Sequence, residues 1–127
     1  MIVTLSGGLG AGKTTLVRGM LCGLGWHGPV KSPSYALVEH YEFPSLYFYH
    51  FDFYRLERLD EWDSAGFAEY FRADSIAVIE WPERVAARLP ATDVALTLSL
   101  VEPGRMLELR ACTAAGEACL DAFEGNP

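Results

Sequence analysis

The sequence predicts one α/β domain, spanning residues 1–127, with a sheet that is covered on both faces. A glycine-rich motif at residues 7–14 lies between a short apolar run and a segment whose apolar residues recur at helical spacing, which indicates a strand, a turn and a helix. The run from Leu46 to Tyr54 is aromatic on both faces, which is typical of a strand inside a sheet. With 127 residues, half of them hydrophobic, the chain is long enough for one core.

The first strand and the first helix flank the glycine-rich motif. Residues Ile2 to Leu5 are all apolar or β-branched and predict a buried strand that ends near Ser6. From about Lys13 to Leu24 the apolar positions follow helical spacing, and Gly25 is a typical helix stop. A loop rich in glycine, proline and serine follows.

The remainder of the chain predicts more strands than helices. One polar stretch with scattered apolar positions, Glu57 to Phe71, is expected to be partly helical, and the signal is weak from about residue 113 onward. Alternating or continuous apolar runs bounded by turn residues predict the strands, and the last two form a hairpin around Pro103, Gly104 and Arg105. The predicted strands are Tyr35–Glu42, Leu46–Phe53, Ser75–Ile79, Val94–Val101 and Met106–Cys112.

Charge and composition exclude some classes of protein. The net charge of −7 argues against a protein that binds nucleic acid alone, because phosphate binding needs a basic surface. No apolar stretch approaches the roughly 18 residues of a membrane span. The glycine-rich motif begins at Gly7, so we expect no signal peptide and a cytoplasmic protein.

Neither the cysteines nor the histidines predict a special site. The three cysteines include no pair at CxxC spacing, so we expect free thiols. We also expect the cysteines to be buried as small hydrophobic side chains. The histidines have no metal-ligand spacing, and we expect them to be structural or surface residues. The residues concerned are Cys22, Cys112, Cys119, His27, His40 and His50.

The glycine-rich motif matches GxxxxGK[ST], the P-loop, at every fixed position from Gly7 to Thr14. Glycines allow backbone N–H groups to surround phosphate oxygens, and the helix N-terminus adds partial positive charge. Lys13 would reach the β- and γ-phosphates, and the Thr14 hydroxyl would bind Mg²⁺.

Two carboxylates follow predicted strands, where an α/β fold places its ligands. Asp52 and Glu80 could bind Mg²⁺ or orient an attacking water, or they could be ordinary solvated carboxylates. Glu80 could also cap a helix that begins at Pro82. Ser32 and Ser34 could sense the γ-phosphate in a switch loop, or could form a turn around Pro33.

The sequence resembles the TsaE family, also called YjeE, from Ile2 to about Cys112. The resemblance rests on five motifs that occur in order. They are Gly7–Thr15, Lys31–Tyr35, Phe51–Arg55, Glu80–Glu83 and Gly104–Arg105. The resemblance implies a three-layer P-loop NTPase-like domain with a mainly parallel central sheet. It also implies a helix and a strand ahead of the P-loop strand, so the N-terminal part of the family fold is expected to be missing.

The resemblance also implies an ATPase that uses Mg²⁺ and supports threonylcarbamoyladenosine (t6A) modification of tRNA with the proteins TsaB and TsaD. Contact with tRNA is implied only through that complex. Lys13, Asp52, Glu80 and Trp81 would serve activity, and Thr14 and Glu80 would bind Mg²⁺. The nucleotide would be held by Gly10, Ala11, Gly12, Lys13, Thr14, Thr15, Ser34, Asp52 and Gly104. The family usually has aspartate at Gly8 and threonine at Ser34.

Two other functions remain open from the residues. A small P-loop kinase could use Arg55 and Arg58 as lid arginines, although the chain leaves little room for an acceptor pocket. A nucleotide-sensing adaptor without useful turnover is the other alternative.

Overall fold

The computed structural model describes residues 1–8, 10–33 and 36–124. Every strand and helix predicted from the patterns is present, although the first strand after the P-loop helix begins at Val38. In chain order the elements are β1 (Ile2–Ser6), α1 (Lys13–Gly23), β2 (Val38–Glu42), β3 (Tyr47–Asp52), α2 (Leu59–Ala65), η1 (Phe67–Tyr70), β4 (Ser75–Glu80), η2 (Pro82–Arg84), β5 (Val94–Val101), β6 (Gly104–Ala111) and α3 (Ala114–Glu124).

A six-stranded sheet in the order β2-β3-β4-β1-β5-β6 forms the centre of the molecule. Its four inner strands, β3, β4, β1 and β5, run parallel, and the two outer strands are antiparallel to their neighbours. The sheet is therefore mainly parallel, as predicted. The carboxyl ends of β1, β3 and β4 meet at one edge, because Glu80 is paired with both Leu5 and Asp52.

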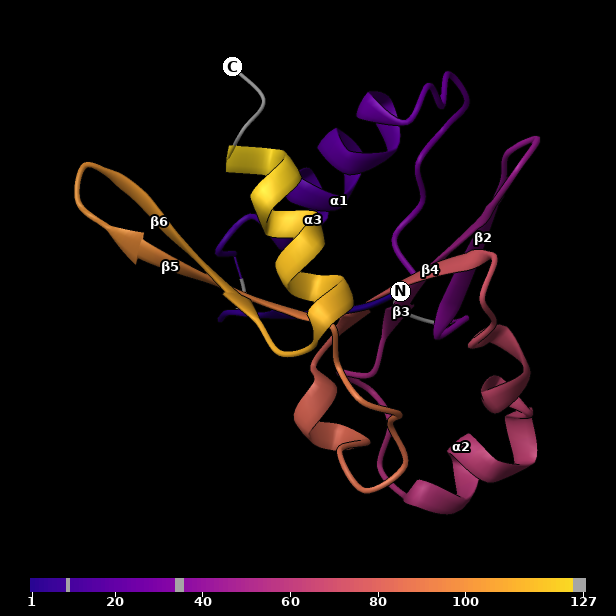
Figure 1. The fold of residues 1–127 in the computed structure, drawn as a ribbon. Coiled ribbons are helices and arrows are strands. Elements are labelled where there is room, and N and C mark those ends of the chain that lie inside the picture. The colour runs from indigo at the N-terminus through magenta and orange to yellow at the C-terminus, as the bar shows by residue number, and fades with distance from the viewer. Residues whose placement is uncertain (9, 34–35, 125–127) are drawn as a thin grey trace.

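Helices cover both faces of the sheet and create three layers (Figure 1). α1 and α3 lie on one face (Figure 1), where Val17 and Leu21 of α1 belong to a buried cluster with residues from β1 to β5, among them Leu5 of β1. α2 and η1 lie on the other face and bury Trp62 and Phe67. The two-faced aromatic pattern of β3 follows from this layering, since Phe48 joins one core and Phe51 the other.

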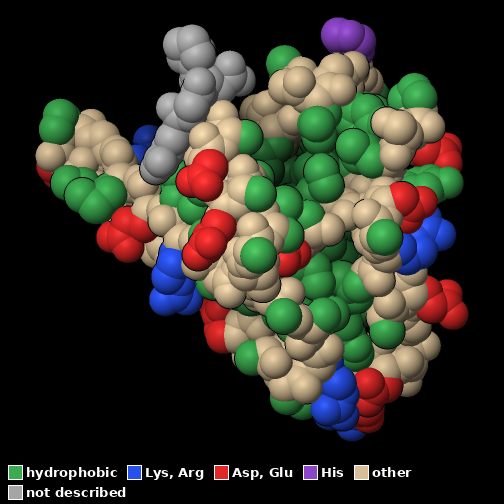
Figure 2. All heavy atoms as spheres, viewed as in Figure 1, with side chains coloured by type: hydrophobic (Ala, Val, Ile, Leu, Met, Phe, Trp, Pro, Cys, Tyr) green, Lys and Arg blue, Asp and Glu red, His purple; other side chains and the backbone are tan. Residues whose placement is uncertain are grey.

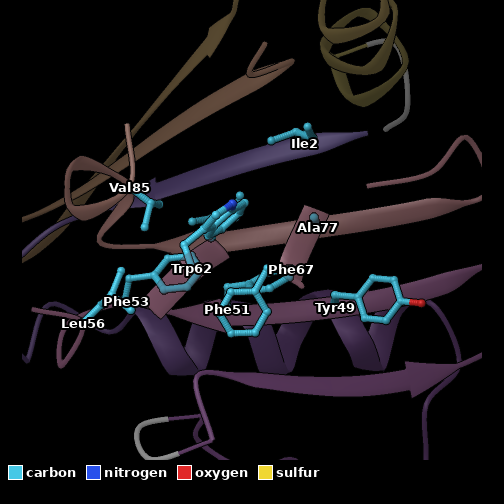
Figure 3. Close-up of a cluster of buried hydrophobic side chains, with 10 residues drawn as sticks. Ile2, Tyr49, Phe51, Phe53, Leu56, Trp62, Phe67, Ala77 and Val85 are labelled. Carbon is cyan, nitrogen blue, oxygen red and sulfur yellow. The ribbon is translucent and has the colours of Figure 1, made fainter. Parts of the chain in front are cut away.

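The core on the α2 face is built largely from aromatic rings (Figure 3). Phe51 lies 5.5 Å from the ring centres of both Phe53 and Phe67. Trp62 packs at 5.5 Å against the same two neighbours. Such offset and edge contacts stabilise beyond their buried area, so this face fixes β3 firmly.

A hydrogen-bonded junction fixes α3, whose sequence signal was weak. The Asp93 carboxylate accepts hydrogen bonds from the Ile2 amide at 2.8 Å and from the Thr113 hydroxyl at 2.6 Å. The Gly116 amide in turn donates to the Thr113 hydroxyl oxygen at 3.1 Å. A Cβ at Gly116 would overlap the Asp93 carbonyl oxygen, so α3 approaches β5 at a distance that only glycine allows.

The surface differs from the sequence prediction in one respect. All three cysteines are free but exposed, so the expectation that they are buried is wrong. Figure 2 shows hydrophobic side chains gathered in a hollow next to α3, and an apolar groove of about 420 Å³ runs there between α1, α3 and the sheet. None of the helices in the described residues is long and apolar enough to cross a bilayer.

Candidate functional site

The P-loop occupies the turn between β1 and α1, as its spacing predicts. A Cβ at Gly7 would lie 2.6 Å from the Leu98 carbonyl oxygen on β5, so glycine is required for this close approach. Gly12 precedes the helix with φ +104, and no side chain caps the first turn of α1. Amide groups at this helix end are thus free of a capping side chain, as an anion-binding turn requires.

Lys13 is the first residue of α1, and its side chain is 6% exposed. Its ammonium donates to the Gly7 carbonyl oxygen at 2.8 Å, so the side chain folds back over the loop. The same Nζ lies 3.8 Å from Oε1 of Glu80 and 4.1 Å from the ring centre of Trp81. A buried ammonium needs such partners, and their geometry holds the charge beside the P-loop.

Glu80 ends β4 and is 3% exposed. Its Oε2 lies 2.5 Å from Nε2 of His50, which is fully buried in β3. The other carboxylate oxygen faces Lys13. Glu80 is therefore a buried carboxylate held by two opposite neighbours, and the solvated alternative considered from the sequence is wrong.

The capping alternative for Glu80 is also wrong. The η2 turn that begins at Pro82 has Trp81 at its N-cap, and no side chain caps it. Trp81 has φ +57, a left-handed conformation that a bulky residue adopts at a cost of about 1–3 kcal/mol. Its ring contacts the Tyr54 ring, with centres 5.0 Å apart. Strain of this kind is concentrated at functional sites.

Asp52 lies at the end of β3, directly opposite Glu80 in the sheet. Its Oδ1 accepts a hydrogen bond from the Tyr54 amide at 3.0 Å. Burial raises the pKa of the Asp52 carboxyl above its ordinary value, the Tyr54 amide opposes this, and the negative charge of Glu80 raises it further. A carboxylate with a raised pKa at an edge that also holds Lys13 suits proton transfer or water orientation.

The other predicted residues lie at varying distances from this centre. Thr14 is half-buried and Thr15 exposed in the first turn of α1, while Ala11 is buried and Gly10 is exposed in the loop. Gly104 begins β6 opposite Val101 on the hairpin. Ser34 lies outside the described residues, whereas Ser32 is exposed.

Two residues near this edge were given no role in the site by the sequence analysis. Arg105 reaches from β6 and donates through Nε to the Ala11 carbonyl oxygen of the P-loop at 2.7 Å. His50 was expected to be structural or superficial, yet it is the closest polar partner of Glu80 among the described residues. Its spacing of two from Asp52 on a strand, which puts both on one face, is the signal that could have found it.

The donor set suits a magnesium nucleotide rather than a transition metal. Within the described parts of the chain there is no group of three or more histidine, cysteine, aspartate or glutamate residues able to hold a metal ion. Mg²⁺ commonly takes one or two protein oxygens together with phosphate and water oxygens. The Thr14 hydroxyl and a carboxylate fit that pattern. A Cβ at Gly8 or Gly10 would meet no atom within 4 Å, so the space above the loop is open.

Comparisons with known proteins identify the family. The family model "Threonylcarbamoyl adenosine biosynthesis protein TsaE" matches residues 1–107. The tRNA threonylcarbamoyladenosine biosynthesis protein TsaE of Haemophilus influenzae is 46% identical over 123 residues, covering 97% of this chain and 78% of that protein. The protein of the same name from Treponema pallidum is 39% identical, covering 81% of this chain and 76% of its own length.

A solved structure gives the same result for the fold. The crystal structure of Bacillus subtilis YdiB superposes with a TM-score of 0.80 at 26% identity, and the match covers 99% of this chain and 78% of the other. The six-stranded α/β sheet with its glycine-rich turn is therefore a P-loop fold. Taken with the family match over most of its length, this shows that the chain belongs to the TsaE family of threonylcarbamoyladenosine biosynthesis proteins.

Proposed function

We propose that the protein is a Mg²⁺-dependent ATPase that supports threonylcarbamoyl transfer in tRNA t6A modification, together with TsaB and TsaD. The observation that carries this proposal is the arrangement of Lys13, Glu80 and Trp81 around the P-loop. A buried ammonium lies 3.8 Å from a buried carboxylate at the N-terminus of a helix that no side chain caps. That combination of positive charge, carboxylate and free amides is what a magnesium nucleotide requires.

In this proposal, different residues bind the phosphates and the metal ion. The P-loop amides and two of the three Lys13 N–H donors would bind phosphate oxygens, since the third already donates to Gly7. Thr14 and Glu80 would hold Mg²⁺, which would neutralise phosphate charge. Asp52, on the neighbouring strand, would orient the water for attack.

The partners follow from the family and from charge. The family description and its relatives name threonylcarbamoyladenosine biosynthesis, and transfer to tRNA needs a nucleic-acid surface that a chain of net charge −7 does not supply alone. We therefore place tRNA on the partner proteins and ATP turnover on this chain, in the cytoplasm.

The substitution Glu80→Gln tests the proposal. The amide is nearly isosteric, so the fold should persist, whereas a metal-side carboxylate would lose its charge. Steady-state ATPase with TsaB and TsaD should fall about tenfold to a thousandfold, which corresponds to about 1.4–4 kcal/mol of barrier. Glu69→Gln, an exposed acid on η1, is the matched control and should keep wild-type turnover.

Three outcomes would contradict the proposal. Unchanged turnover in folded Glu80→Gln would remove Glu80 from the metal site. Phosphate that appears on a small-molecule acceptor instead of in water would favour a kinase. ATP binding without turnover, even with both partners present, would favour a nucleotide-sensing adaptor.

A further inference from the structure

The His50 side chain is buried at a position where an apolar side chain would cost less free energy than a histidine ring. It is 0% exposed in the middle layer of the sheet, and its Nδ1 has no hydrogen-bond partner among the described residues. Burying a polar atom without a partner destabilises a protein. In the described structure the ring makes one polar contact, from Nε2 to Glu80. This contact is therefore the reason why a histidine suits the position.

The direction of this hydrogen bond follows from its partners. A carboxylate can only accept, so Nε2 carries a hydrogen and donates to Oε2 of Glu80. The histidine itself is fixed by its strand, because β3 is paired on both sides, to β2 and to β4. The donor thus has a rigid base.

This contact restricts a rotation that is otherwise soft. The last torsion of a glutamate side chain is broad, so a lone carboxylate would sample many orientations. With Oε2 held by His50, the remaining oxygen, Oε1, is directed to the side of Lys13 and the P-loop. A ligand arriving there meets an oxygen that is already oriented.

We propose that His50 is a positioning residue that orients the Glu80 carboxylate toward the nucleotide-bound Mg²⁺. The proposal rests on the function proposed above. His50 touches neither nucleotide nor metal in this role and acts through Glu80 alone. Such supporting residues around metal ligands typically change affinity or activity about 10- to 100-fold when they are replaced.

The test compares replacements that keep or lose the donor. His50→Gln can place an amide N–H near the position of Nε2, while His50→Leu and His50→Phe fill the space without a donor, so that one folded donor-free variant suffices. Val78→Ala is the matched core control, since Val78 is fully buried and is paired with His50 in the sheet. Circular dichroism and urea unfolding confirm the fold of each variant.

Two readouts are measured for each variant with the partner proteins present. The first is kcat and the Mg²⁺ concentration that gives half-maximal ATPase. The second is ATP affinity by calorimetry with and without Mg²⁺, which does not depend on turnover. We expect a donor-free variant to lower kcat at least tenfold and to reduce the Mg²⁺-dependent gain in ATP affinity. Affinity without Mg²⁺ should be unchanged, and His50→Gln should recover most of the loss.

A double variant separates positioning from packing. If His50 acts through Glu80, adding a donor-free replacement to Glu80→Gln should cause little further loss. The inference is overturned if the folded donor-free variants match wild type, if Val78→Ala causes the same loss, or if the two losses multiply in the double variant. If Glu80→Gln itself keeps full activity, the proposed function fails instead, and the two failures are distinguishable.

Discussion

Lys13→Met is the most direct perturbation of the P-loop that the structure suggests. Methionine replaces the apolar stem of lysine at similar length, while the ammonium and its contact with the Gly7 carbonyl oxygen are removed. Lys13 is 6% exposed, so the variant should not alter the outer surface. The expected effect is a loss of nucleotide affinity in a folded protein.

The magnitude follows from the contacts of the ammonium. A hydrogen bond to a charged group contributes about 1.5–3 kcal/mol, which corresponds to an affinity loss of roughly 10- to 150-fold. A bare pair of charges at 4 Å and an effective dielectric constant of 20 would give about 4 kcal/mol. The net effect should be smaller than that bound, because Lys13 must share its charge between phosphate and Glu80, 3.8 Å away.

Isothermal titration calorimetry with MgATP measures this loss directly. Arg18→Met is the matched control, because Arg18 is an exposed cation on the same helix and the substitution removes the same charge. Its affinity should stay within twofold of wild type. An unchanged affinity for folded Lys13→Met would refute the reasoning, since it would mean that the buried ammonium serves only Gly7 and Glu80.

Three further predictions concern stability. Burial raises the pKa of Asp52, so its ionised form destabilises the fold at neutral pH. Asp52→Asn should therefore increase the urea midpoint at pH 7 while lowering ATPase, and a lower midpoint would contradict this. The hydrogen bond from the Thr113 hydroxyl lowers the pKa of the Asp93 carboxyl. The ionised carboxylate therefore stabilises the fold at a pH above the ordinary aspartate pKa of about 3.9, and this stabilisation is lost as the pH falls below that value. In Asp93→Asn the urea midpoint should therefore fall less steeply at acidic pH than in wild type. Identical pH profiles for the two proteins would contradict this role of Asp93. Gly116→Ala should lower the free energy of unfolding by about 1–3 kcal/mol through overpacking, despite alanine's helix preference of about 1 kcal/mol. A more stable variant would show that α3 can shift freely.

Much of the fold could be predicted because its signals are local. The apolar run of β1, the helical spacing of α1 and the two-faced aromatic pattern of β3 each reflect burial of one element, and periodicity reports burial. The P-loop could be predicted for the same reason, since all its fixed residues lie within one turn. Helix α3 gave little signal because its position depends on Asp93, twenty residues from Thr113.

The candidate site was predictable only in part. Asp52 and Glu80 were found because strand ends meet at one edge of a parallel sheet, and the structure pairs them there. His50 was missed because its signal is its spacing of two from Asp52 on one strand, and the histidines were compared only with metal-ligand spacings. Arg105 was assigned no role of its own because its contact with Ala11 spans 94 positions. The cysteine prediction failed since burial preference is an average over proteins and does not fix individual positions.

Destabilising features are concentrated at the P-loop edge, and this has a consequence for ligand binding. The buried ammonium of Lys13 lies beside the buried carboxylate of Glu80 and beside Trp81, whose φ is +57. Trp81 also packs against the aromatic core on the α2 face of the sheet, so that core supports the strained residue directly. A magnesium nucleotide would give the buried ammonium and the buried carboxylate additional charged partners. Binding to the folded state alone must then raise stability by mass action, about 2.7 kcal/mol at a hundredfold excess over Kd. Thermal unfolding with and without MgATP should show this shift in wild type and lose most of it in Lys13→Met, and equal shifts would place the nucleotide elsewhere.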